Sequence, residues 1–520
     1  MTLSNAQQTT STIRGVPADR TLAANLLSEL TPEHLRFEKK EFVMSERNND
    51  GITSAENLMG KSTPSNGGRG KVMIIKFLVL AAILTVALGY LGDRSRGQSF
   101  DDQRRGQKEQ GFDRQISENA RQMMEQGKHI FRYDTFGDEA YWTDKLLLHQ
   151  AIQGTKFGGV GPGVSPKTAL AVGLKVDLDA LPQPLINQIR QGKVNLDDPA
   201  TTLALIKLDA VLGIKGTFNP DGSLKAMGLS CAVCHSTVDD AFAPGIGHRL
   251  DGWSNQDLNV GAIVSLAPDL SALTSLLGVD EVTVKQVLAS WGPGKFDAEL
   301  NLDGKAFRPD GKPAAVLIPP AFGMAGVNLH TWGGGWGGVT YWNAFVANLE
   351  LQGQGTFFDA RLNDPVKYPV AARAGFGNKR SDTDMVTAKL AALQFYQLAI
   401  PPPTAADGSF DRAAAARGET LFKGKANCAQ CHVPPLFTEP GWNTHKASEI
   451  GIDDFHANRA PDNSYRTSPL RGLFSHMKRG FYHDGRFATL LDVVNHYDRF
   501  KKLSLTEQEK KDLVEYLKSL

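Results

Sequence analysis

The chain has 520 residues, 41% of them hydrophobic and 22% charged, which is enough for about two to four globular domains with real apolar cores. Its formal net charge is +1 and neither half is strongly basic, which gives no support for a nucleic-acid partner, since such a partner would need a basic footprint. All four cysteines fall in two Cys-x-x-Cys-His motifs, which leaves none for a structural disulfide.

The N-terminal part of the sequence predicts a disordered stretch followed by a membrane anchor. Residues 1–72 are polar and without a sustained period, a composition typical of disorder. The apolar run 77–91 follows two lysines, the pattern of an export signal. Since no small-x-small cleavage site stands out after it, we expect residues 73–92 to stay in the membrane as a signal anchor. Met73 precedes the run, which suggests that translation starts there and that residues 1–72 are not made.

The middle of the chain reads as helices separated by loops. We expect a polar tether over residues 93–114 and then a helix over 115–132 with one apolar face. Short helical stretches and Gly/Pro loops follow in 133–230, and residues 240–350 are loop-rich. Convincing strand alternation is rare, so the predicted fold class is mainly α.

The C-terminal part shows a second organisation that starts near Asp382. A helix predicted over 382–398 stops at three consecutive prolines, which cannot continue it. Another helix is predicted over 411–422, and the chain ends in a helix opened by a capping box of Thr506 and Glu509.

The two cysteine motifs are haem-attachment sites by their chemistry. In each, two thiols can form thioethers with the vinyl groups of one haem, and the following histidine can ligate its iron. A thioredoxin-type pair would not need that histidine, and a zinc site would need the two distant motifs to meet. We therefore predict two covalent c-type haems, one on Cys231, Cys234 and His235 and the other on Cys428, Cys431 and His432.

Two haem sites and an export signal define the expected organisation. Because c-type haem is attached on the outer side of the bacterial inner membrane, we expect residues 92–520 to be periplasmic. Two cytochrome c-like domains with long loop-rich insertions are predicted, one over residues 115–380 with an extended N-terminal region and one over residues 381–520.

Around the second motif, the sequence resembles the bacterial di-haem cytochrome c peroxidase and MauG superfamily. The resemblance covers residues 411–520 and rests on segments 417–438, 465–472, 481–490 and 493–497. The first half is similar only in outline, through Pro319-Pro320 followed by Trp332 and then Glu350.

The resemblance implies that the N-terminal haem binds and cleaves hydrogen peroxide and that the C-terminal haem receives electrons. It implies that Trp332 relays electrons between the haems and that Glu350 is the distal acid/base catalyst. Trp332 could instead pack a core, and Glu350 could lie on a solvated helix face. The implied partners are peroxide and a small c-type cytochrome or cupredoxin, and the family also suggests calcium between the haem domains.

The remaining iron ligands and the propionate partners are left open by the sequence. Tyr497 stands where classical members have a methionine and MauG-type members a tyrosine, with Met477, His496 and His483 as alternatives at the second haem. His248 could be a displaceable ligand of the first haem. Arg471 and Arg486 are candidate propionate partners, since guanidinium groups pair with carboxylates.

Two other functions remain alternatives to a peroxidase. A rubber-oxygenase type of enzyme would have an open apolar distal pocket without a carboxylate. A di-haem electron carrier would have both irons six-coordinate, for example through permanent binding of His248.

Overall fold

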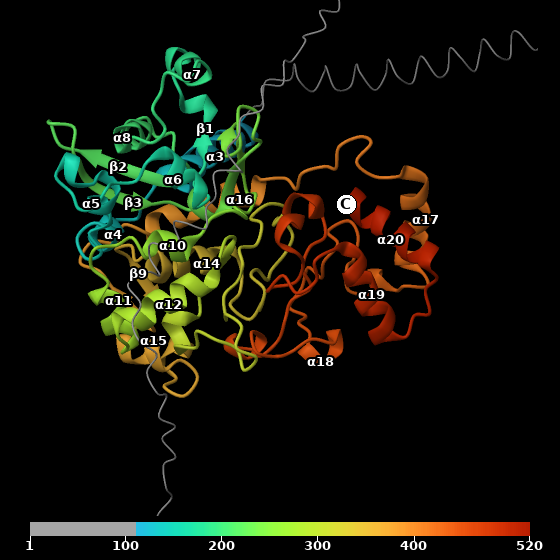
Figure 1. Ribbon diagram of the computed structural model, residues 1–520. Coiled ribbons are helices and arrows are strands. Elements are labelled where there is room, and N and C mark those ends of the chain that lie inside the picture. Colours follow the sequence, from blue (N-terminus) through green and yellow to red (C-terminus); the bar gives the residue numbers. More distant parts are fainter. Residues whose placement is uncertain (1–110) are drawn as a thin grey trace, which may run out of the picture. The chain divides into compact units, whose positions relative to one another are not determined.

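The computed structural model describes residues 111–520, which belong to one compact unit (Figure 1). The predicted disordered stretch 1–72, the predicted anchor 73–92 and most of the predicted tether 93–114 lie outside the described residues. None of the helices among residues 111–520 is both long and apolar enough to cross a membrane.

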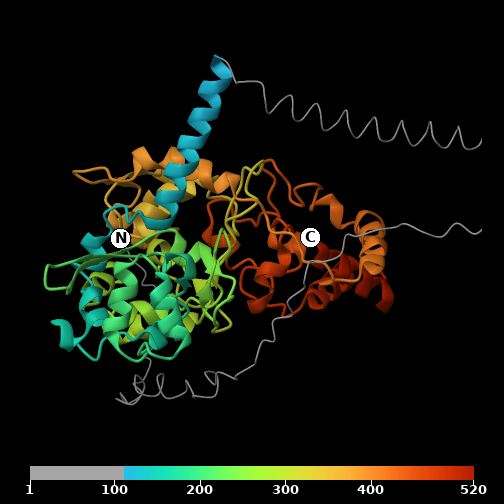
Figure 2. The same cartoon turned by 90° about the horizontal axis from the view of Figure 1, so that it is seen from above.

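The first described helix, α3 (Phe112–Tyr133), takes in the end of the predicted tether as well as the predicted helix over 115–132. Its first half projects away from the neighbouring elements, and Phe112 is 73% exposed (Figure 2). Its second half packs on α16 (Leu390–Ala399) so closely that a Cβ on Gly127 would lie 2.0 Å from the Ala392 carbonyl oxygen.

The predicted mainly α class agrees with the observed architecture, in which strands are short. Residues 111–520 contain five two-stranded sheets. The longest pairs β2 (Ile214–Phe218) antiparallel with β3 (Leu224–Leu229), and it delivers the chain into the first cysteine motif. The other pairs are β1 (Val176–Asp177) with β5 (Ile246–Gly247), β4 (Ser236–Val238) with β6 (Arg249–Asp251), β7 (Lys295–Phe296) with β8 (Val316–Leu317), and β9 (Thr356–Phe358) with β10 (Asn378–Arg380).

Short helices build the N-terminal half of the described chain, residues 111–400, around a large apolar core. This core joins side chains from Trp142 to Ile318, and α10 and α12 pack against each other within it. The helices of this half are α4 (Glu139–Trp142), α5 (Leu148–Gln153), α6 (Pro166–Ala171), α7 (Gln183–Arg190), α8 (Pro199–Lys207), α9 (Ala232–His235), α10 (Val260–Val264), α11 (Ser271–Leu277), α12 (Glu281–Trp291), α13 (Leu300–Asp303), α14 (Val339–Phe345) and α15 (Pro369–Ala374).

The C-terminal half, residues 401–520, has its own core, which is formed by side chains between Phe422 and Leu520. Here α17 (Arg412–Lys423) crosses α20 (Glu507–Ser519), and α19 (Leu490–Lys501) packs beside α20. The predicted capping box at Thr506 is present, and a second one at Thr489 opens α19. The small helix α18 (Ala447–Ile450) lies further from this crossing (Figure 1).

The helix predicted over 382–398 begins later than expected and packs on a different part of the molecule. It begins with a 3₁₀ turn at Thr387–Lys389 and continues as α16. Although the sequence suggested that it opens the C-terminal domain, α16 shares an apolar core with Ile130 and Phe131 of α3. It therefore packs with the N-terminal half.

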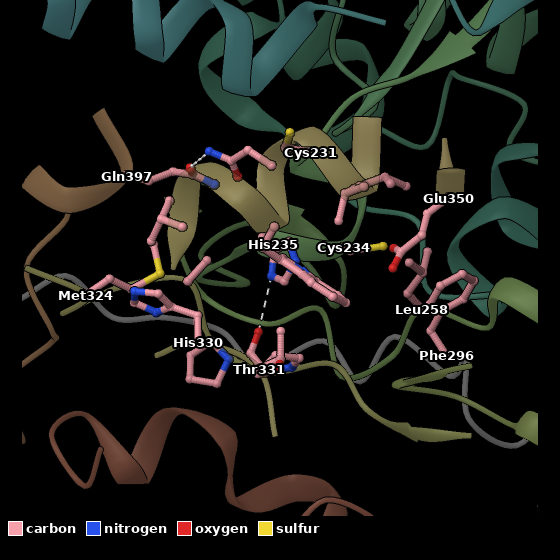
Figure 3. Close-up of a pocket in the computed structure, with 18 of the residues that line it drawn as sticks. Cys231, Cys234, His235, Leu258, Phe296, Met324, His330, Thr331, Glu350 and Gln397 are labelled. Atoms are coloured by element: carbon pink, nitrogen blue, oxygen red, sulfur yellow. Dashed lines mark hydrogen bonds between the residues drawn. The ribbon is translucent and has the colours of Figure 1, made fainter. Parts of the chain in front are cut away.

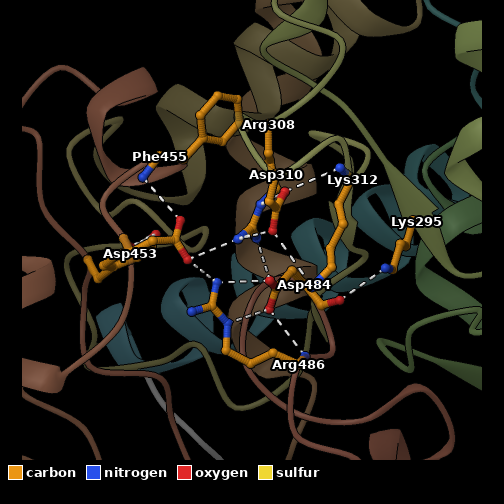
Figure 4. A network of polar contacts seen from close by, with 9 residues as sticks. Lys295, Arg308, Asp310, Lys312, Asp453, Phe455, Asp484 and Arg486 are labelled. Atoms are coloured by element: carbon orange, nitrogen blue, oxygen red, sulfur yellow. Dashed lines mark hydrogen bonds and ion pairs between the residues drawn. The ribbon is translucent and has the colours of Figure 1, made fainter.

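Polar contacts hold the two halves together. The Leu317 backbone N–H donates to the His483 carbonyl oxygen at 2.6 Å. Arg308 of the N-terminal half donates to Asp484 at 2.6 Å and to Asp453 at 3.2 Å, and Arg486 donates to the same two carboxylates (Figure 4).

Candidate haem sites

The first cysteine motif begins directly after β3 and forms the short helix α9. Cys231 directly precedes the helix, and its carbonyl oxygen accepts a hydrogen bond from the His235 N–H at 3.1 Å. The His235 Nδ1 lies 3.1 Å from the Pro319 carbonyl oxygen, which can accept its proton. That contact fixes the ring and leaves Nε2 as the nitrogen available to ligate a metal.

A cavity of about 190 Å³ opens beside this motif (Figure 3). Cys231, Cys234 and His235 line it, and the three are half-buried because they face this internal space. Burial raises the pKa of both thiols to about 12 and lowers the pKa of His235 to about 4. The imidazole is therefore neutral at physiological pH, as iron ligation requires.

Glu350 projects into the same cavity from the end of a π turn, Val346–Glu350, that follows α14. Figure 3 shows its carboxyl group beside the Cys234 sulfur. Its buried Oε1 has no hydrogen-bond partner among the described residues. Burial, with smaller contributions from Glu299 and Asp297, raises the pKa of Glu350 to about 8. Such a carboxyl can both donate and accept a proton near neutral pH.

The C-terminal half contributes a polar part of the cavity wall, including Arg466, Arg471 and His476. Arg466 Nε donates to the Thr331 carbonyl oxygen, but its buried Nη1 finds no hydrogen-bond partner within residues 111–520. Burial lowers the pKa of Arg466 to about 10. An unmatched buried guanidinium is costly, so this wall suits an anionic group such as a haem propionate.

The second motif repeats the proximal geometry of the first. Cys428 begins a short 3₁₀ turn, and the His432 N–H donates to its carbonyl oxygen at 3.0 Å. The His432 Nδ1 lies 3.1 Å from the Phe437 carbonyl oxygen, which again leaves Nε2 available. Burial raises the pKa of the Cys428 thiol to about 11 and lowers the pKa of His432.

Both motifs therefore fit c-type haem. The four cysteines are free thiols, each pair is followed by a fixed neutral imidazole, and the first pair faces a cavity with an unmatched cation. Haem bound there would supply an iron centre that accepts and donates single electrons.

Comparisons with known proteins agree with these motifs. No protein-family model matches the chain. The chain is 29% identical over 185 residues to methylamine utilization protein MauG of Methylorubrum extorquens, a match that covers 31% of this chain and 51% of that protein. It is 25% identical over 244 residues to cytochrome-c peroxidase IdrP1 of Denitromonas iodatirespirans, a match that covers 35% of this chain and 64% of that protein.

The chain is thus similar to MauG and to a di-haem type of cytochrome c peroxidase. It spans about half the length of the MauG relative and under two thirds of the peroxidase relative. A solved MauG-like protein associated with microbial copper homeostasis is 21% identical, covering 42% of this chain and 76% of that chain, but its TM-score of 0.26 is too low to add to the argument.

Three residues that were predicted from the sequence lie together at the first site. Trp332, Glu350 and Arg471 all line the cavity. The Trp332 indole N–H donates to the Leu317 carbonyl oxygen at 2.8 Å, and the Trp332 carbonyl oxygen accepts from the Arg466 N–H at 3.2 Å. Trp332 thus contacts the N-terminal half through its indole ring and the C-terminal half through its backbone.

Two other predicted site residues, His248 and Arg486, have carboxylate partners and do not line the first cavity. His248 is half-exposed, and its Nδ1 lies 2.8 Å from Asp179, whose hydrogen bond raises the pKa of the imidazole. His248 is not among the residues that line the cavity. Arg486 pairs with Asp453 and Asp484, so its charge is already matched. Arg466 and Arg471 remain the guanidinium groups on the cavity wall.

At the second motif, Tyr497 on α19 is the candidate ligand that faces the thiols. Burial raises its pKa, and Cys428 and Cys431 are close enough to add to that increase. Met477 packs in the same apolar core as Cys428. The His496 Nε2 lies 2.8 Å from the Ile450 carbonyl oxygen, which can accept its proton.

The fourth candidate, His483, is buried in a stack of rings. It lies 5.1 Å from both His456 and Tyr465, measured between ring centroids. Burial, with a smaller contribution from His456, holds the pKa of His483 well below its usual value.

The sequence did not single out several residues that line these sites. Arg466 lies in segment 465–472, which is one of the segments that carry the resemblance, but nothing in the sequence marks it as a cavity residue. His330 and His476 also line the first cavity, and burial lowers the pKa of each to about 4. Tyr482 lies 6.5 Å from Tyr497 between ring centroids.

The expected calcium stays a prediction. One trio with metal-ligand spacing occurs among residues 111–520, with ligand atoms of Cys431, Glu439 and His445 all within 4.8 Å of one another. The Cys431 sulfur is predicted to bind haem, and calcium prefers an all-oxygen site. This trio therefore does not supply the expected calcium site.

Proposed function

We propose that this chain is a periplasmic di-haem oxidoreductase that reduces hydrogen peroxide, or uses it to oxidise a partner. Electrons would enter at the C-terminal haem from a small c-type cytochrome or cupredoxin and pass to the N-terminal haem. The relatives named MauG and cytochrome-c peroxidase support this class of reaction. Residues 73–92 would hold the protein at the inner membrane.

The observation that carries the proposal is the Glu350 carboxyl group on the wall of the first cavity. Cleavage of peroxide between its oxygens needs one group that takes a proton from the near oxygen and returns it to the far one. Glu350 has an unpartnered oxygen within the described part of the chain and a pKa of about 8, so it can act in both directions. A rubber-oxygenase-like site would lack this carboxylate.

The electron path would run through Trp332. Its ring lies on the cavity wall, and its backbone is joined to the C-terminal half through Arg466. An aromatic side chain at the junction of the halves supports a role in conduction between the two cofactors. His235 and His432 would be the proximal ligands.

Tyr497, which lies near the second motif, favours oxidation of a partner over simple removal of peroxide. Tyr497 lies near Cys428 and Cys431, and tyrosinate is a known haem ligand. A tyrosine ligand should lower the potential of this haem relative to methionine. The electron-carrier alternative gains no support from His248, which is paired with Asp179 at the surface.

The first experiment is a peroxide reaction of the full chain, produced with a haem-maturation system. The reduced protein is mixed with hydrogen peroxide and a reduced small c-type cytochrome, and the visible spectrum is followed. Catalytic oxidation of the cytochrome supports peroxide reduction. A spectral change without donor turnover supports oxidation of another partner, and no response to peroxide contradicts the proposal.

Glu350→Gln tests the carboxyl group directly. We expect the peroxide reaction to slow by about 10²–10⁴-fold, because the amide cannot exchange the proton. Since the base role needs the carboxylate, the wild-type rate should rise as the pH passes about 8, and the variant should lose this rise. Stopped-flow absorbance at several pH values measures both effects.

Glu281→Gln is the matched control, because Glu281 lies on the surface of α12 and pairs only with Lys285 among the described residues. This control should react like the wild type. Equal haem content in all three proteins shows that the variants have matured. If Glu350→Gln reacts as fast as the control, Glu350 is not the acid/base group.

A further inference from the structure

Three further buried carboxyl groups lie near Glu350, on the side away from the cysteine motif. Asp297, Glu299 and Asp303 follow β7, and they are 2%, 5% and 6% exposed. One cation reaches them from the C-terminal half, Arg459, which is 1% exposed. It pairs with Asp303 through Nε at 2.9 Å and Nη2 at 3.0 Å, and its Nη1 lies 2.9 Å from Asp297.

The charges of this cluster do not balance if every carboxyl ionises. Glu299 and Glu350 form no ion pair among residues 111–520, so four carboxyls share mainly one guanidinium. Buried unpaired carboxylates keep their protons instead. In agreement, burial raises the pKa of Asp297 to about 7 and also raises that of Glu299. The charged and titratable groups that face Asp297, Glu299 and Asp303 are Lys305, Glu350, Tyr368 and Arg459.

A second cavity of about 60 Å³ connects two of these carboxyls. Asp297 and Glu350 both line it, together with the amides of Asn301 and Gln352 and apolar side chains of α10, α11 and α12. Glu350 also lines the first cavity and so stands between the two. This volume and these polar groups suit a few water molecules.

Peroxide reduction consumes protons at this place. In the balanced reaction, H₂O₂ takes up two electrons and two protons and yields two waters. Glu350 can move a proton from one peroxide oxygen to the other, but this transfer brings no new proton to the site. The two protons that complete the second water must therefore come from outside the first cavity.

We propose that Asp297 is the proton donor that reloads Glu350 during turnover, through water in the second cavity. This inference rests on the proposed peroxide reduction. The Asp297 carboxyl would release its proton to the water, the water would pass a proton to the Glu350 carboxylate, and Asp297 would be left as a carboxylate. Arg459 Nη1, 2.9 Å away, would stabilise that charge, and solvent would later return a proton.

Asp297→Asn in the mature di-haem protein tests the relay. We expect kcat for peroxide to fall by about tenfold or more, because the carboxamide cannot release a proton. The KM for peroxide should stay unchanged, and the solvent deuterium isotope effect on kcat should increase. Asp303→Asn is the matched control, because Asp303 pairs with the same Arg459 and is equally buried but does not line the second cavity.

A second measurement does not depend on turnover. Infrared spectra over pH 5–9 should contain a protonated carboxyl band that titrates near neutral pH. This band should be absent in Asp297→Asn and present in Asp303→Asn. If the band does not depend on Asp297, the residue holds no exchangeable proton and the proposal is overturned.

The kinetic outcomes separate this inference from the proposed function. A wild-type protein that does not consume peroxide overturns the proposed function and this inference with it. Normal turnover of Asp297→Asn, with an unchanged isotope effect, overturns the inference alone. An equal loss in Asp303→Asn would assign the effect to the fold of the cluster and would also overturn it.

Discussion

Tyr497 is the residue whose replacement should separate the two haems spectroscopically. It is half-buried near both thiols of the second motif. Because the axial ligand sets the electronic state of a haem, Tyr497→Phe should change the absorption and EPR spectra of the second haem and leave the first haem unchanged. Redox-poised spectra of the mature protein, taken haem by haem, measure this change.

The control for that experiment is Tyr396→Phe. Tyr396 is buried, and its hydroxyl donates to Asp251 at 2.6 Å in the N-terminal half. This variant should leave the second haem's spectrum as it is. If Tyr497→Phe is equally silent, another side chain ligates that iron, and Met477 becomes the next candidate.

At the residue scale, the sequence alone predicts the haem attachment sites because their chemistry is local. The spacing of Cys231, Cys234 and His235 is itself the requirement for a c-type haem. The partners of Arg486 and His248 could not be predicted, because their carboxylates come from segments distant in the sequence. Asp297 gave no signal for the same reason, since its environment exists only when Arg459 reaches it from the other half.

At the element scale, Gly418 controls how closely α17 and α20 can cross. A Cβ at this position would lie 2.1 Å from the Asp512 carbonyl oxygen and 2.8 Å from the Tyr516 Cβ. The Asp512 contact is with backbone, so the helices would have to separate. We expect Gly418→Ala to destabilise the protein by about 1–3 kcal/mol despite the higher helix propensity of alanine.

Chemical denaturation followed by far-UV circular dichroism measures this loss. Ala416→Ser is the control, because Ala416 lies exposed on the same helix, and it should change the stability little. If Gly418→Ala is as stable as the wild type, the crossing can relax and the close approach is not required.

The helices themselves were predicted well where the sequence carried local signals. The expected helix over 411–422 is α17 (Arg412–Lys423), and the predicted capping box opens α20. The partner of α16 was not predictable, because an apolar helix face does not specify which helix it will pack on. Likewise, glycine lowers helix propensity, but Gly127 of α3 allows the close contact with α16.

At the scale of the whole molecule, the first haem site depends on how the two halves dock. The N-terminal half supplies the cysteine motif and Glu350, while Arg466, Arg471 and His476 complete the wall from the C-terminal half. Any change that loosens the junction should therefore alter the first site as well as the overall stability.

The junction between the halves can be loosened at one polar network, which consists of Arg308, Asp453, Asp484 and Arg486 (Figure 4). Burial alone would raise the pKa of Asp484, but Arg486 and Arg308 lower it well below its usual value. A carboxylate with a lowered pKa stabilises the fold above its unfolded pKa of about 4, and this contribution is lost as the pH falls. Asp484→Asn should thus cost about 1.5–3 kcal/mol at neutral pH, and the difference from the wild type should shrink in acid.

Denaturation of the mature protein at several pH values tests this, with the spectrum of the first haem as a second readout. Asp310→Asn is the control, because Asp310 also contacts Arg308 but is 43% exposed and lies within the N-terminal half. We expect Asp484→Asn, but not Asp310→Asn, to change both stability and the first haem's spectrum, because Asp484 joins Arg308 to the other half and Asp310 does not. A spectrum unchanged by Asp484→Asn would mean that the remaining contacts, such as Leu317 with His483, suffice to hold the halves in register.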